Sequence, residues 1–172
     1  MAIPSTAAEW DAEPDLFQLV KCYRGKVWFD RLRLFAATCC RRIWGLIPPG
    51  PAQEAVEAAE RYATGQITLS ELYSALRRAR TVVDAASEVP GSDSRIHGSL
   101  AETVALAAWA CALPAERPAL EAPAYVLAVA SNRWCEQASS NESVRAFNAE
   151  MAELVSLLRA TVGNPFAPVA QG

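Results

Sequence analysis

The sequence has few of the residues and motifs on which most small catalytic and metal sites are built. His97 is the only histidine, none of the five cysteines forms a Cys-x-x-C pair, and no Walker or Gly-x-Gly-x-x-Gly loop occurs. A zinc site needs about four thiolate or imidazole ligands, and phosphate-binding loops need those glycines. The Glu-x-x-His motif of di-iron bundles and the Gly-x-Ser-x-Gly motif of hydrolases are also missing. The sequence therefore disfavours a metal enzyme, a nucleotide enzyme and a serine hydrolase.

Strand patterns and long apolar runs are missing as well. β-branched residues are scattered and rarely alternate with polar ones. The longest apolar stretch, residues 104–113, is too short to span a bilayer, and residues 1–4 lack the features of a signal peptide. The net charge of −3 provides no overall basic field for nucleic acid. We therefore expect a cytoplasmic protein, not bound to a membrane, whose thiols are reduced and mostly buried.

The residues that are abundant favour helices. Ala, Leu, Glu and Arg are strong helix formers, and 52% of the chain is hydrophobic, which is enough for a substantial core. Apolar periodicity, capping boxes and Pro or Gly breaks predict helices near 14–24, 29–47, 51–64, 69–88, 99–113, from Pro123 onward, and 141–162. We predict an all-α, single-domain bundle of about seven mostly antiparallel helices. Residues 1–12 are expected to be a flexible N-terminal segment, 13–166 the helical domain and 167–172 a C-terminal tail.

The segment 29–47 has the clearest amphipathic pattern. Its apolar residues share one face at helical spacing: Phe29, Leu32, Ala36, Cys39, Cys40, Ile43 and Ile47. The Cys39-Cys40 pair lies on this face, and adjacent helical residues diverge by about 100°, which makes chelation of one ion awkward. Because cysteine is among the most buried residue types, packing in the core is the expected role of the pair.

The other side of this segment carries Leu34 and Trp44 interleaved with Arg33 and Arg41. One interpretation is a central helix that is contacted on several sides, with arginines that reach solvent or pair with carboxylates. The other is a partner-binding surface, because Arg and Trp are enriched at interface hot spots. Most apolar helix faces are explained by packing within the domain, so the first interpretation has more weight.

Several motifs resemble those of one family. Residues 31–44 resemble a segment that recurs in uncharacterised proteins of Gemmata-like planctomycete bacteria. An acidic Glu9-Trp10 start, the Glu-rich helix at 55–63, and Gly163-Asn164-Pro165-Phe166 with Pro168 match in the same order. The resemblance implies no established activity, cofactor or catalytic residue. Relatives often continue past the last motif, and this modular use fits an interaction or adaptor domain.

Three functional hypotheses follow. The leading one is a non-enzymatic helical protein-interaction or scaffold/adaptor domain without cofactor or metal. It binds a partner protein or itself through Arg33, Leu34, Arg41 and Trp44. A nucleic-acid-associated protein is the second, and it would use two basic clusters: Lys21, Arg24, Lys26, Arg31, Arg33, Arg41 and Arg42, and then Arg77, Arg78 and Arg80. A metal-binding or enzymatic protein is the third, and it would need Cys39, Cys40 and His97 within a few ångströms.

Overall fold

A computed structural model describes residues 3–23, 29–87, 100–113, 118–135 and 140–166. Over these ranges the chain is an all-α bundle, which confirms the predicted fold class. The described elements are α1 (Ala7–Ala12), α2 (Leu16–Lys21), α3 (Phe29–Arg42), the 3-10 helix η1 (Trp44–Leu46), α4 (Pro51–Ala63), α5 (Leu69–Ser87), α6 (Leu100–Cys111), α7 (Pro118–Cys135) and α8 (Ser140–Thr161). None of the helices in these ranges combines the length and the hydrophobicity that spanning a bilayer would require.

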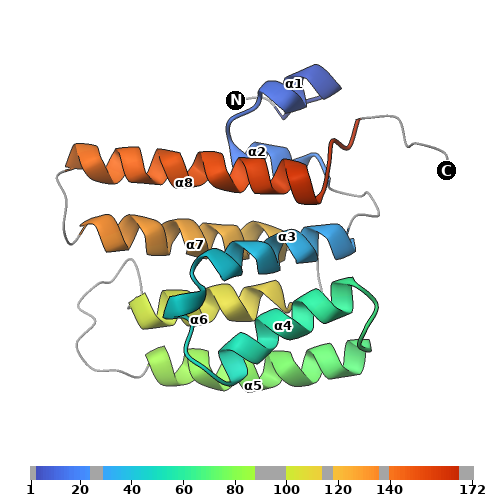
Figure 1. Ribbon diagram of the computed structural model, residues 1–172, viewed down its shortest axis with the longest axis vertical. Coiled ribbons are helices and arrows are strands. Elements are labelled where there is room, and N and C mark those ends of the chain that lie inside the picture. The colour runs from blue at the N-terminus through green and yellow to red at the C-terminus, as the bar shows by residue number, and fades with distance from the viewer. Residues whose placement is uncertain (1–2, 24–28, 88–99, 114–117, 136–139, 167–172) are drawn as a thin grey trace.

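Helix α3 lies at the centre of the bundle. In Figure 1, α8, α7, α6 and α5 lie in successive rows, and α3 and α4 lie against these rows. Consecutive α-helices are also neighbours in space from α3 to α8, and α3 packs in addition on α6, α7 and α8. These contacts agree with the interpretation of residues 29–47 as a central helix that is contacted on several sides.

Local signals define several helix ends as the sequence predicts. Thr68 and Glu71 form the predicted capping box at the start of α5, where the amide of Glu71 donates to Thr68 Oγ1 (3.3 Å) and the amide of Thr68 donates to Glu71 Oε2 (2.7 Å). Gly163 follows α8 with a φ of +87°, a conformation that favours glycine. Such caps act over a single turn, which is why the sequence alone identifies them.

The N-terminal segment differs from the prediction. Residues 1–12 were expected to be flexible, but residues 7–12 form α1, whose start is capped by Thr6 Oγ1, an acceptor from the amide of Glu9 at 3.2 Å. Trp10 is only 2% exposed, and its ring meets that of Tyr23 edge to face, with centroids 6.5 Å apart. Burying so large an aromatic side chain offsets the cost of ordering a short helix. The helical domain therefore includes α1.

The start of α7 was also predicted incorrectly. Pro123 was expected to open this helix, but the helix begins at Pro118 and Pro123 lies inside it. A proline inside a helix removes one backbone hydrogen bond and costs about 3 kcal/mol. Val126 and Val129 on this helix are buried, and α7 packs on α6, α3 and α8. Tertiary packing therefore outweighs the local preference of Pro123 for a helix start.

Replacing Trp10 by alanine should test whether α1 belongs to the core. We expect Trp10→Ala to lower the free energy of unfolding by about 3–5 kcal/mol, because it removes a buried aromatic side chain. Val144→Ala is a suitable control, since Val144 is 59% exposed, and it should change stability by less than about 0.5 kcal/mol. Urea denaturation followed by circular dichroism measures both. A loss below about 1 kcal/mol for Trp10→Ala would contradict a core role for α1.

Candidate interaction surface

The apolar face of α3 is buried almost as predicted. Leu32 is 6% exposed, Ala36, Cys39 and Cys40 are fully buried, and Ile43 and Ile47 beyond the helix are also enclosed. Phe29 is the exception at 44% exposed. The expectation that Phe29 faces the core was therefore wrong. Phe29 is the first residue of α3.

Arg33 lies inside the bundle rather than on an open surface. Its side chain is only 6% exposed, and Nη1 donates to the carbonyls of Leu113 (2.6 Å) and Cys111 (3.4 Å) at the end of α6. Its guanidinium carbon is 5.1 Å from the ring centroid of Tyr62. Burial lowers the pKa of Arg33. The prediction that Arg33 lies on a partner-facing surface was therefore wrong, because α4 and α6 enclose it.

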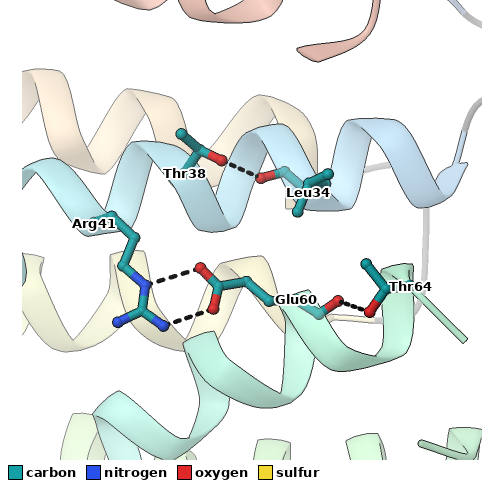
Figure 2. Close-up of polar contacts among 5 residues, drawn as sticks. All are labelled: Leu34, Thr38, Arg41, Glu60 and Thr64. Atoms are coloured by element: carbon teal, nitrogen blue, oxygen red, sulfur yellow. Dashed lines mark hydrogen bonds and ion pairs between the residues drawn. The ribbon is translucent and has the colours of Figure 1, made fainter. Parts of the chain in front are cut away.

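Arg41 and Trp44 form a stacked pair at the end of α3. The guanidinium carbon of Arg41 is 3.9 Å from the ring centroid of Trp44, which is half-buried. Figure 2 shows the same guanidinium reaching from α3 to Glu60 on α4, through Nε–Oε1 (2.8 Å) and Nη2–Oε2 (2.6 Å) hydrogen bonds. This bond raises the pKa of Arg41. Glu60 therefore orients Arg41, and the side chain of Arg41 remains 37% exposed.

Leu34 completes the part of the predicted surface that is accessible. It is half-buried, and its carbonyl accepts a hydrogen bond from Thr38 Oγ1 at 2.8 Å. Figure 2 shows Leu34 and Arg41 along the side of α3 that borders α4. We call Leu34, Arg41 and Trp44 the α3 surface. Of the four predicted residues, the structure thus leaves these three accessible in part and encloses Arg33.

Most of the other arginines whose contacts are described have partners within the chain. Arg42 on α3 pairs with Glu150 on α8 at 2.6 Å, and the α5 cluster is divided between Arg78–Glu54 (3.1 Å) and Arg80–Asp84 (2.8 Å). Arg24 and Lys26 lie outside the described residues. These pairs match the interpretation that the arginines form ion pairs within the bundle. The carboxylates neutralise positive charge that would otherwise attract the phosphate groups of a nucleic acid.

Another arginine contact, which the sequence pattern did not predict, joins α8 to the end of α1. Nη2 of Arg159 on α8 donates to the carbonyls of Trp10 (3.1 Å), Asp11 (2.7 Å) and Glu13 (3.0 Å) at the end of α1. Asn164 Nδ2 donates to Asp11 Oδ1 (3.0 Å). Arg159 looks in the sequence like an ordinary basic residue in the last turn of a helix, so its role depends on a distant partner.

The thiols near α3 lie deep in the core. Cys40 Sγ donates to the carbonyl of Ala107 (3.3 Å) and Cys111 Sγ to that of Ala108 (3.1 Å). Burial raises the pKa of Cys39, and a hydrogen bond with Cys40, together with burial, raises that of Cys111. Among the described residues no group of three or more His, Cys, Asp or Glu side chains could hold a metal ion. His97, the third member of the proposed metal or catalytic set, lies outside those residues.

The fold and these contacts define the class of protein as an all-α helical bundle with a partly exposed Arg–Trp pair at its central helix. Comparison with known proteins found no matching family model, no matching curated protein and no matching solved structure. The resemblance to planctomycete proteins therefore stays a prediction from the sequence motifs.

Arg33→Ala should show how far the bundle depends on this arginine. The change leaves the buried carbonyl of Cys111 and the part-buried carbonyl of Leu113 without this donor, and we expect a loss of about 2–3 kcal/mol in the free energy of unfolding. Arg80→Ala removes an exposed, ion-paired arginine and should cost less than about 1 kcal/mol. Chemical denaturation of both variants makes the comparison. Equal, small effects would mean that water or a shift of α6 replaces Arg33 easily.

The thiols should be protected until the chain unfolds. We expect Cys22, Cys39, Cys40 and Cys111 to react with an aromatic disulfide reagent at pH 8 only after denaturation, because all four are buried and only thiolates react. The experiment uses a Cys135→Ser variant, so that every thiol counted is one of these four. Rapid reaction in the native protein would contradict their burial and would reopen a redox or metal role.

Proposed function

We propose that this chain is a non-enzymatic helical interaction or scaffold domain that binds a partner protein or a second copy of itself through the α3 surface. The observation that supports this most strongly is the Arg41–Trp44 stack, held by Glu60. Arg and Trp are the residue types most enriched at interface hot spots. Because Arg41 has a bidentate carboxylate partner and an aromatic partner, less side-chain freedom is lost when a second protein covers the pair.

The chemistry of the α3 surface also indicates what its partner would present. Glu60 already neutralises Arg41, so the partner needs no carboxylate there. Trp44 and Leu34 are half-buried and offer apolar area, and Trp44 lies directly against Arg41. A partner with an apolar or aromatic centre and a polar rim would match this arrangement.

Two substitutions test the α3 surface. Trp44→Ala removes the apolar anchor, and Arg41→Glu places like charge beside Glu60, so we expect each to weaken binding by roughly tenfold or more. Arg80→Glu is the matched control, because Arg80 is also ion-paired and lies 5.3 Å from the ring of Trp109 on a different part of the bundle. It should leave binding unchanged.

The binding itself is measured in two ways. Light scattering over a concentration series reports self-association, and a native pull-down with mass spectrometry identifies a partner, which is then purified and titrated by calorimetry. Thermal unfolding confirms that each variant is folded. If the folded Trp44→Ala and Arg41→Glu variants assemble like the wild type, the α3 surface is not the binding site.

A further inference from the structure

A second surface of the bundle has the features of a docking groove. A groove of about 480 Å³ runs along α8 and ends at the start of α2. Phe147, Met151 and Val155 are spaced i, i+4, i+8 on α8 and give the groove an apolar side. Val144, 59% exposed, precedes them on the same side of the helix. Methionine and aromatic side chains are typical of grooves that receive an apolar helix face.

Helix α2 already covers the adjoining part of α8. Asp15, at the N-terminal end of α2, lines the groove together with Val155 and Arg159. At the other end, the Tyr23 hydroxyl donates to the carbonyl of Gly163 just after α8. Helix α2 therefore runs beside the C-terminal half of α8 in the same direction (Figure 1). It begins where the groove ends.

The contacts of α2 show which kinds of side chain pack on this side of the bundle. Leu16, Leu19 and Val20 follow the i, i+3, i+4 spacing and are at most 5% exposed where α2 packs on α7 and α8. Asp15 Oδ1 caps α2 by accepting from the amide of Phe17 at 2.8 Å. Asp15 takes part in none of the ion pairs among the described residues. Arg159, which also lines the groove, donates instead to the carbonyls of Trp10, Asp11 and Glu13.

We propose that this groove binds an amphipathic helix of a partner protein, placed end to end with α2 along α8. The partner helix carries aliphatic residues at i, i+3 and i+4, as α2 does, and a Lys or Arg at its C-terminal end. That cation meets Asp15 and also the negative end of the partner helix's own dipole. The groove continues an interface that the chain already makes with one of its own helices.

The inference adds a second binding face to the proposed function. It uses none of Leu34, Arg41 and Trp44, so substitutions on the two faces can be tested separately. Loss of binding at the groove would leave binding through the α3 surface intact, and the reverse also holds.

The test titrates the full chain, labelled with ¹⁵N, with a synthetic peptide of about three helical turns. The peptide has Leu at the α2 spacing and two Lys at its C-terminal end. We expect NMR shifts centred on Asn148, Met151 and Ala152, and weaker binding when Glu replaces the two Lys. Ala152→Arg should weaken binding by roughly tenfold or more, because it fills an exposed position that lines the groove. Ala160→Arg, at an exposed alanine of α8 that does not line the groove, should not.

Three outcomes would overturn the proposal. One is equal binding of a scrambled peptide of the same composition. This comparison uses only the wild-type protein, so no substitution can disturb its folding. Another is a similar effect of Ala152→Arg and Ala160→Arg. The third is a wild-type dimer in sedimentation equilibrium that Ala152→Arg converts to monomer, since the occupant would then be a second copy of this chain.

Discussion

The bundle depends on arginines that bind the carbonyl groups at the ends of other helices. Every α-helix leaves its last carbonyls without a backbone partner, and burying them unsatisfied is costly. Arg33 satisfies the end of α6, and Arg159 that of α1. Arg31 donates to the carbonyl of Val162 at the end of α8 (3.2 Å). Arginine suits this role because it offers several donors and stays charged when it is buried. Each contact also favours a positive charge at the negative end of a helix dipole.

Helix α1 and the end of α8 meet as a consequence. Trp10 lies beneath the guanidinium of Arg159, whose carbon is 5.5 Å from the ring centroid. Asn164 reaches back to α1, and the carbonyl of Gly163 accepts from the Tyr23 hydroxyl. Trp10, Gly163 and Asn164 therefore have structural roles in this bundle. Such roles are compatible with the proposed interaction domain, in which a rigid scaffold presents the α3 surface.

The accuracy of sequence-based prediction differed between local and distant interactions. The capping box of Thr68 and Glu71 and the buried stripe of α3 follow from residues within a few turns of one another. Pro123 was misjudged because its local preference competes with the packing of α7. Arg33 was misjudged because a helical wheel shows only that it lies away from the stripe. It cannot show that α4 and α6 cover that side.

The sequence by itself determined that the chain is helical, where most helices begin and end, and that Cys39 and Cys40 belong to the core. Those properties depend on propensity, periodicity and caps, which act within one or two helical turns. Only the tertiary structure decided which arginines are enclosed and which stay accessible. Arg33 and Leu113 are 80 residues apart, and Arg159 and Asp11 are 148 apart. Their pairing depends on how the helices pack. This packing removes Arg33 from the four residues of the predicted surface and leaves Leu34, Arg41 and Trp44.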